Sequence, residues 1–269
     1  MVDPLVGEAT GDLMAWEIEE DDGVAIVHMN SNKVNRQNPA FFSDLDTSLD
    51  RLTSDFPNLP VVLTSKEQVF SAGFDFDYWF PLIEKDDFET VQASYDRFKQ
   101  INLRLFSYPR PTVAALNGHA YAGGLITALC CDSRIAVDQG ADFTLNEVPI
   151  GLAMPSLFTE IIRYAVGTPV AAKATLTGSI YTGPEALSLG IVDSLVPKND
   201  LLPEAVRAAK ALKPDCHTAY AFSKRALQGP TLSRIREETE QLDSQFGKTW
   251  CSTDARSATA RTYAKLKAR

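Results

Sequence analysis

The segment of residues 111–151 constrains the fold of this chain more than any other. It begins with residues 111–116, an apolar run of the length of one buried strand. A turn at residues 117–118 breaks that run, and the glycine pair of residues 123–124 follows it. Apolar residues then resume at helical spacing, as Leu125, Ile126, Leu129 and Cys130. This order predicts a strand, a glycine turn and the start of a helix.

A helix that starts directly after glycines suits the binding of negative charge. The first backbone N–H groups of a helix have no partner within it, and the positive end of the helix dipole lies behind them. Glycine lets a ligand approach that backbone closely. Further along, Glu147 places a carboxylate within an otherwise apolar stretch. An N–H donor for developing charge, together with a carboxylate in apolar surroundings, outlines a site for proton abstraction.

The composition argues against several classes of protein. The chain has 26 basic and 35 acidic residues, and a net charge of −9 disfavours nonspecific binding of nucleic acid or of an anionic membrane. No run approaches the ~18 apolar residues that a membrane span requires. Residues 1–12 lack the apolar core of a signal peptide, and residues 267–269 are not a peroxisomal address. We therefore expect a soluble cytoplasmic protein with no membrane or nucleic-acid partner.

The four cysteines form no pattern typical of metal binding. Cys130 and Cys131 are adjacent within a predicted buried helix, and the sequence contains no Cys-x-x-Cys motif. No cluster of cysteine and histidine has metal-ligand spacing either. We expect no metal site and a reducing compartment.

Strand and helix patterns alternate up to about residue 197, and only helical patterns follow. The expected strands are residues 16–19, 24–29, 61–63, 111–116 and 191–196. Besides the helix after the glycine pair, helices are expected from Pro39 and over residues 86–107, 155–166, 169–176, 201–212, 218–227, 232–246 and 254–266. This order predicts an α/β protein with a core of residues 1–197 and an all-helical region of residues 198–269.

Two motifs resemble one known family. The sequence AALNGHAYAGGLITALCCDSRIA, residues 114–136, is similar to the core signature of the crotonase (enoyl-CoA hydratase/isomerase) superfamily. Upstream, Phe70-Ser71-Ala72-Gly73-Phe74-Asp75 resembles the first oxyanion turn of that family. The resemblance covers roughly residues 24–196. It implies a spiral core of β-β-α turns, and C-terminal helices that build a homotrimer or a dimer of trimers.

The resemblance also implies a substrate and an intermediate. Crotonase-like enzymes of fatty-acid β-oxidation act on acyl-CoA thioesters through an enolate, and coenzyme A is part of the substrate, so no separate cofactor is expected. By matching motifs, the N–H groups of Phe74 and Gly123 would hold the thioester oxygen. Each preorganised donor of this kind is worth roughly 2.7–4 kcal/mol where charge develops in a dry site. Tight helix packing is the structural alternative for Gly123 and Gly124.

Glu147 matches the later of the two glutamates that the hydratases of this family use. The earlier position holds Ile126, whose side chain would lie beside the α and β carbons of the acyl group. One base can move a proton from C2 to C4, which is the reaction of the Δ3,Δ2-enoyl-CoA isomerases, and an apolar Ile126 would help to exclude water. We therefore expect an isomerase. The alternatives are an enoyl-CoA hydratase with a second acid from elsewhere, and a non-catalytic acyl-CoA-binding or RNA-binding protein.

Recognition of coenzyme A is less clear from the sequence. By resemblance, the backbone of Ser71, Ala72 and Asp75 would contact the adenine. The basic residue that often follows is replaced by Asp77, so the candidates for the phosphates are Lys33, Arg36 and the C-terminal lysines and arginines.

Several other residues have both a structural and a functional interpretation. For His119, Asp132 and Glu160 the structural interpretation is favoured. For Asn146 and for the aromatic run of residues 78–80 both remain open, the first as a turn residue or a partner of Glu147, the second as core or as a wall of the acyl pocket.

Overall fold

The computed structural model describes residues 16–212 and 214–268, which form a mixed α/β structure. The six-stranded sheet has the order β1 (Glu17–Asp21), β2 (Val24–Met29), β3 (Val61–Ser65), β4 (Thr112–Leu116), β6 (Ser133–Val137) and β9 (Ser194–Val196). The β1–β2 hairpin is antiparallel and every later pairing is parallel. Parallel neighbours require crossover connections, and helices supply most of them here.

A second, small sheet lies beside the first and was not predicted from the sequence. It has three strands, in the order β5 (Ala120–Tyr121), β7 (Asp142–Thr144) and β8 (Tyr181–Thr182). Strands this short carry no readable alternation of apolar and polar residues, which is why the pattern missed them. Their pairing matters for the site, because β5 leads into the glycine turn and β7 leads to Glu147.

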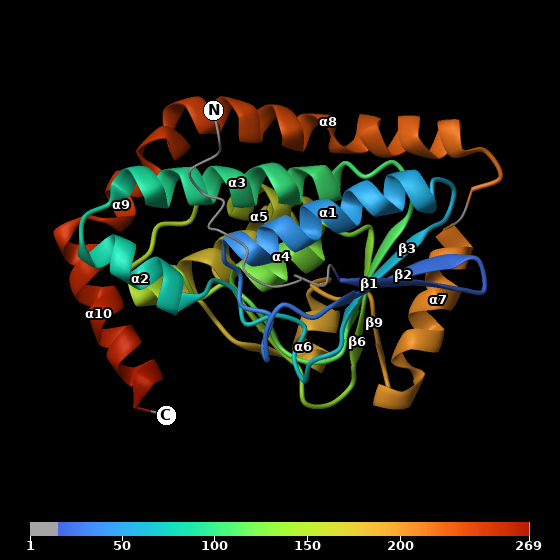
Figure 1. The fold of residues 1–269 in the computed structure, drawn as a ribbon, viewed down its shortest axis with the longest axis horizontal. Helices are drawn as coiled ribbons and strands as arrows, with labels where there is room; N and C mark the ends of the chain where they lie inside the picture. Colours follow the sequence, from blue (N-terminus) through green and yellow to red (C-terminus); the bar gives the residue numbers. More distant parts are fainter. Residues whose placement is uncertain (1–15, 213, 269) are drawn as a thin grey trace.

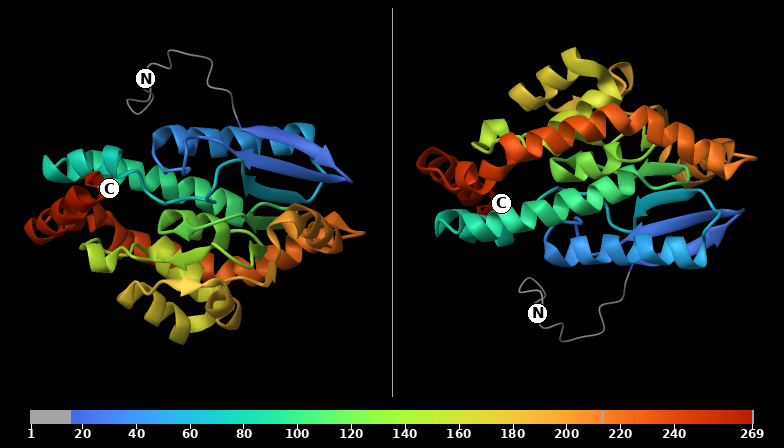
Figure 2. Two further views of the ribbon diagram at one scale, coloured as in Figure 1. Left: turned by 90° about the horizontal axis from the view of Figure 1, so that it is seen from below. Right: turned by 90° about the horizontal axis from the view of Figure 1, so that it is seen from above.

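Helices cover the sheets and complete each turn of the chain. The α-helices are α1 (Pro39–Asp55), α2 (Phe76–Glu84), α3 (Phe88–Phe106), α4 (Gly123–Leu129), α5 (Ser156–Thr177), α6 (Gly183–Ser188), α7 (Leu201–Leu212), α8 (His217–Gln241), α9 (Phe246–Trp250) and α10 (Thr253–Lys267). Short 3-10 helices are η1 (Val148–Ile150), η2 (Lys198–Asp200) and η3 (Asp243–Gln245). Figure 2 shows the chain advancing across the molecule, with α1 on one side and α5 and α6 on the opposite side.

The expected strand–turn–helix order from residue 111 is confirmed, and several helix limits differ. The helix expected over residues 218–227 and most of the one expected over residues 232–246 are one helix, α8, which continues through Pro230 and ends at Gln241. The break expected between residues 155–166 and 169–176 is confirmed, because Gly167 within α5 has a non-helical φ of 76° and kinks the helix. The helix expected from residue 86 begins two residues later, because Asp86 has a left-handed φ of 63°. Helix α2 was not expected.

The C-terminal helices pack on the core as well as on each other. Helix α7 lies against β3, β4 and β6, and α8 lies against α5. Figure 1 shows α9 and α10 at the end of the molecule opposite the β1–β2 hairpin, where α10 contacts α2 and η1. The division near residue 197 stays a prediction, and no strand follows that point among the described residues.

Candidate active site

The two glycine turns expected to hold a substrate oxygen lie in contact with each other. Gly73 follows β3 and has a φ of +78°, a conformation that side chains disfavour. A Cβ atom on Gly73 would lie 2.6 Å from the carbonyl oxygen of Tyr121 and 3.3 Å from the nitrogen of Gly123. Any side chain at position 73 would therefore push the two turns apart. The close approach brings the backbone around Phe74 next to the first residue of α4.

Two N–H groups at this contact have no acceptor among the described residues, those of Phe74 and Gly123. Their neighbours are fixed by hydrogen bonds. The Gly73 N–H donates to Ser71 Oγ at 3.2 Å, and the Ala122 N–H donates to the Thr144 carbonyl at 2.8 Å. The Gly123 N–H also lies in the first turn of a helix, where no intrahelical acceptor exists. Both N–H groups are therefore available to donate a hydrogen bond to a ligand.

Ala122, which precedes Gly123, is held in a strained backbone conformation. Its φ is 51° and its ψ is −129°, a region that non-glycine residues rarely adopt. Strain of this kind costs about 1–3 kcal/mol and persists where the surrounding structure imposes it. Here the β5–β7 pairing and the start of α4 fix the residue on both sides. The strained peptide therefore sets the direction of the Gly123 N–H.

Glu147 lies at the start of η1, directly after the β7 segment, and it is almost fully buried. Its side chain is 1% exposed, and neither carboxylate oxygen has a hydrogen-bond partner among the described residues. Burial raises the pKa of Glu147 to about 8, because the ionised form loses its hydration without gaining a charged partner. A carboxylate with such a pKa is a stronger base than an ordinary glutamate once it is ionised.

One cavity of about 450 Å³ joins Glu147 to the glycine turns. Its lining residues are Arg36, Ala72, Phe74, Phe76, Asp77, Tyr121, Ala122, Asn146, Glu147, Ile150, Leu152, Thr262, Tyr263, Leu266 and Lys267. The α10 residues of this set close one side of the cavity. The cavity thus combines a buried base, free N–H donors and apolar walls.

The whole core matches one family. The model of the enoyl-CoA hydratase/isomerase family matches residues 19–268. The chain belongs to this family. Its fold is accordingly the crotonase fold that the sequence motifs predicted.

This chain is similar to proteins named enoyl-CoA isomerases and to proteins named enoyl-CoA hydratases. The mitochondrial enoyl-CoA delta isomerase 1 of Homo sapiens is 31% identical over 218 residues, which cover 79% of this chain and 70% of that protein. A probable enoyl-CoA hydratase of Bacillus subtilis is 30% identical over 198 residues, 74% of each chain. Among solved structures, human mitochondrial Δ3,Δ2-enoyl-CoA isomerase has a TM-score of 0.86 at 28% identity, covering 94% of this chain and 98% of that one.

The structure brings some of the expected site residues into the cavity and keeps others out. Phe74, Ala72 and Glu147 line it, and Gly123 follows the lining residue Ala122. The side chains of Ser71 and Asp75 are used elsewhere. Ser71 is fully buried, and its hydroxyl donates to the Asn35 carbonyl at 2.7 Å. Asp75 caps α2 and accepts a hydrogen bond from the Asp77 N–H at 3.1 Å.

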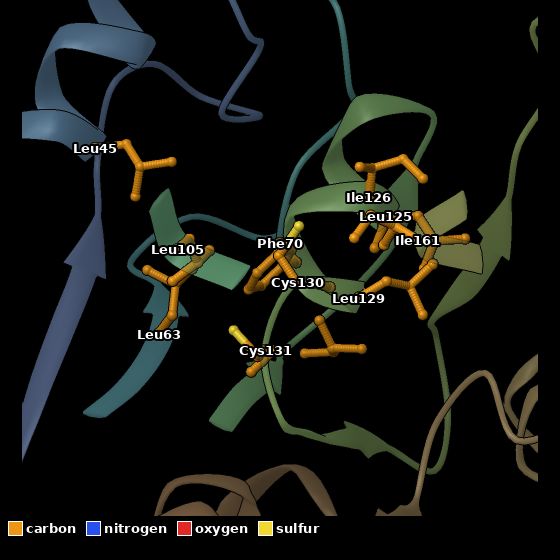
Figure 3. Packing of buried hydrophobic residues seen from close by; sticks show 14 of the residues in the cluster. Leu45, Leu63, Phe70, Leu105, Leu125, Ile126, Leu129, Cys130, Cys131 and Ile161 are labelled. Atoms are coloured by element: carbon orange, nitrogen blue, oxygen red, sulfur yellow. The ribbon is translucent and has the colours of Figure 1, made fainter. Parts of the chain in front are cut away.

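Ile126 differs most from its expected position. Its side chain is fully buried in the hydrophobic cluster and does not line the cavity. Figure 3 shows it on α4 within this cluster, together with Leu125 and with Ile161 of α5. Helix α4 is buried along its whole length and packs on α5, and the cavity is lined by Tyr121 and Ala122, which precede the helix. Ile126 therefore fills the core next to the site and has no surface in the cavity.

The structure shows where the other residues with two interpretations lie. Asp132 accepts hydrogen bonds from Thr112 and Lys224, and Glu160 pairs with Arg234. His119 accepts the Asp142 N–H through Nδ1 at 3.0 Å, which turns its ring away from the cavity. Of the aromatic run, Trp79 is buried, and none of the three residues lines the cavity. Phe74 and Phe76 line it instead, and Asn146 lines it beside Glu147.

Sequence reasoning missed a charged network at the exposed end of the cavity. Asp77 accepts hydrogen bonds from Arg36 at 3.0 Å and from Tyr263 at 2.9 Å, and it pairs with Lys267 at 2.7 Å. Lys267 is the main cause that lowers the pKa of Asp77. The ring of Tyr263 also stacks on Phe80 at 4.4 Å between centroids. No sequence signal connects α10 to Asp77, because their contact depends on how the C-terminal helices fold back.

No cluster of three potential metal-ligating side chains occurs among the residues that the structure describes. Within the same residues, no helix combines the length and the apolar character that crossing a membrane would require.

Burial of Glu147 predicts an unusual dependence of stability on pH. The folded-state pKa of about 8 lies above the ordinary value of 4.5, so the folded protein holds this proton more tightly than the unfolded chain. Stability should therefore fall as the pH rises from about 5 to 8. In Glu147→Gln this loss should be absent, and above pH 8 the variant should be more stable by on the order of 4 kcal/mol. Denaturant unfolding followed by circular dichroism at pH 5 and pH 9 measures the difference. Parallel stabilities of the two proteins at both pH values would contradict the buried, unpaired carboxylate.

Proposed function

We propose that this protein is a Δ3,Δ2-enoyl-CoA isomerase that moves a double bond from C3 to C2 of an acyl-CoA thioester. The observation that carries the proposal is Glu147, a buried carboxylate that faces the cavity. Among the described residues, no second buried acid lines this cavity. The other acid that lines the cavity is Asp77, which is held in ion pairs at the exposed end. The position that a hydratase would need for its second glutamate is Ile126, and it belongs to the core.

The proposed mechanism uses one base for both proton transfers. The ionised Glu147 removes a proton from C2 of the 3-enoyl thioester, and negative charge moves onto the thioester oxygen. The N–H groups of Phe74 and Gly123 stabilise that charge by hydrogen bonds, which are strong in a site without water. The protonated Glu147 then delivers the proton to C4, so the double bond ends at C2–C3 and the base is regenerated. No cofactor takes part in the proposed reaction, because coenzyme A is part of the substrate.

An enoyl-CoA hydratase is the second candidate, because a relative with that name is about equally similar. In hydration, the attacking water must be activated as a nucleophile and a proton must be delivered to the substrate. Two acids accomplish these two steps more readily than one. Apolar residues such as Leu152 and Ile150 surround the base, and they disfavour an ordered water at this position. A binding protein without catalysis is the third candidate, and the raised pKa of Glu147 argues against it.

The choice among these candidates can be tested with two substrates. Wild-type protein should convert 3-hexenoyl-CoA to 2-hexenoyl-CoA faster than it hydrates crotonyl-CoA, as followed by the ultraviolet absorbance of the conjugated thioester. Glu147→Gln should lower the isomerase rate by about 10²–10⁴-fold while its affinity for acyl-CoA stays close to that of the wild type. Glu84→Gln makes the same chemical change on the exposed surface of α2 and should have no effect.

Faster hydration than isomerisation by the wild-type protein would favour the hydratase. Tight binding of both thioesters without turnover would favour the binding protein. Near-wild-type isomerisation by Glu147→Gln would refute the single-base mechanism.

We further propose that Arg36 and Lys267 attract the anionic coenzyme A moiety at the exposed end of the cavity. Asp77 pairs with both cations and therefore competes with the phosphates. Asp77→Asn should lower the KM for acyl-CoA about threefold at low salt, since an exposed ion pair is worth about 0.2–1 kcal/mol. High salt should abolish the difference. Asp22→Asn, which removes the same charge from a surface pair with Lys210, is the matched control. A higher KM in Asp77→Asn would contradict the competition.

We also propose that the protein forms a homotrimer or a dimer of trimers, and that the C-terminal helices form the interface. Large apolar side chains are exposed there in the single chain, Phe222 at 75% and Leu227 at 69%. Such residues usually become buried in an interface. Size-exclusion chromatography with light scattering should give three or six times the mass of one chain. A stable monomer at micromolar concentration would contradict the assembly. The cytoplasmic location remains a prediction from the sequence.

A further inference from the structure

Gln37 is fully buried at the contact between the two glycine turns, although it was not among the expected site residues. Its backbone forms an isolated parallel β-bridge with Phe74. The Gln37 N–H donates to the Gly73 carbonyl at 2.8 Å, and the Asp75 N–H donates to the Gln37 carbonyl at 3.0 Å. These two hydrogen bonds hold Gly73 and Asp75, the residues on either side of Phe74, in place. They fix the plane of the peptide whose N–H remains free.

The side chain of Gln37 reaches the second turn. Its Nε2 donates to Thr127 Oγ1 at 3.0 Å, one helical turn beyond Gly123 on α4. The Thr127 hydroxyl in turn lies within hydrogen-bond distance of two acceptors, the Gly123 carbonyl oxygen at 3.1 Å and Asn102 Oδ1 at 2.9 Å. A Cβ atom on Gly123 would lie 2.3 Å from Gln37 Oε1, so the amide packs directly against that glycine. One residue thus contacts both turns, the first through its backbone and the second through its side chain.

This amide is poorly suited to a purely structural role. Gln37 Oε1 is buried and has no hydrogen-bond partner among the described residues. An unsatisfied buried polar group costs about 1–3 kcal/mol, so an apolar side chain of similar size would suit the core better. The neighbouring Phe74 and Phe98 rings, which pack against Gly123, already form an apolar environment. The contribution of the amide therefore lies in the connection to Thr127 and Gly123.

We propose that Gln37 is a positioning residue that sets the relative placement of the Phe74 and Gly123 N–H groups. The inference rests on the proposed function, in which both groups bind the thioester oxygen. Each donor must lie about 2.7–3.1 Å from the position of the developing oxyanion, so a small separation of the turns weakens the stabilisation. Gln37 acts through the backbone and the Thr127 hydroxyl, and it does not itself touch the substrate.

The test is Gln37→Leu, which keeps both backbone hydrogen bonds and removes the link to Thr127. The kcat for 3-hexenoyl-CoA should fall roughly 10- to 100-fold, while the KM changes less than about twofold. This decrease in kcat is no larger than the one expected when a complete oxyanion donor is lost. The ultraviolet band of bound 2,4-hexadienoyl-CoA provides a second readout. Hydrogen bonds to its carbonyl shift this band to longer wavelength, and the shift should be smaller in the variant.

Thr127 and Gln228 supply the matched variants. Thr127→Val should reproduce the loss of kcat and of the spectral shift, and Thr127→Ser, which keeps the hydroxyl, should restore both. The double variant of Gln37→Leu with Thr127→Val should lose no more than Thr127→Val alone, because that substitution already breaks the connection to Gln37. Gln228→Leu removes an equally buried amide that bonds to the Phe106 carbonyl at 2.7 Å, away from the cavity. It should lower stability and leave kcat and the spectral shift unchanged.

Wild-type kcat and a full spectral shift in Gln37→Leu would overturn the inference, as would an equal loss in Gln228→Leu. If Gln37→Leu does not fold, Thr127→Val with an unchanged spectral shift would overturn it as well. Absence of any spectral shift in the wild-type protein is a different result. It would refute the oxyanion site of the proposed function, and with it the role of Gln37.

Discussion

The close approach of Gly73 to the start of α4 is the contact on which the site depends. The Gly73 turn follows β3, and the Gly123 turn follows β4 by way of the short strand β5. Because β3 and β4 are neighbouring parallel strands, both turns lie at the same edge of the sheet. A side chain on Gly73 would collide with the Tyr121 carbonyl, and the strained φ of Ala122 directs the next peptide toward the same point. The energetic cost of this strain is local, and the pairing of β5 with β7 offsets it.

Glu147 shows the conflict between stability and chemistry in the same region. A buried carboxylate without a partner weakens the folded state once it is ionised, and a salt bridge would relieve that cost. A salt bridge would also lower the pKa of the carboxylate and make it a weaker base. In this protein, the strand β7 and the 3-10 helix η1 place Glu147 in apolar surroundings, where burial raises its pKa to about 8. The resulting group is costly for the fold and suited to removing a weakly acidic proton.

The C-terminal helices complete the cavity from a distance in sequence. Helix α10 packs on η1, where a Cβ atom on Gly151 would lie 2.3 Å from Ala258, and on α2 through the Phe80–Tyr263 stack. These contacts place Lys267 beside Asp77, so an ion pair lies at the exposed end of a cavity whose inner part is apolar.

The sequence by itself predicted the strand–turn–helix unit and the two glycine turns, because each depends on residues that are close together along the chain. It also placed Glu147 within an apolar segment. Only the tertiary structure decided which side chains reach the cavity. It placed Ile126 in the core, because α4 is packed between α5 and the elements around it. It also joined Asp77 to Lys267, and Gln37 to Thr127. These pairs are separated by most of the chain or by several elements, and their contacts follow from the packing of helices and turns, which no local pattern of residues encodes.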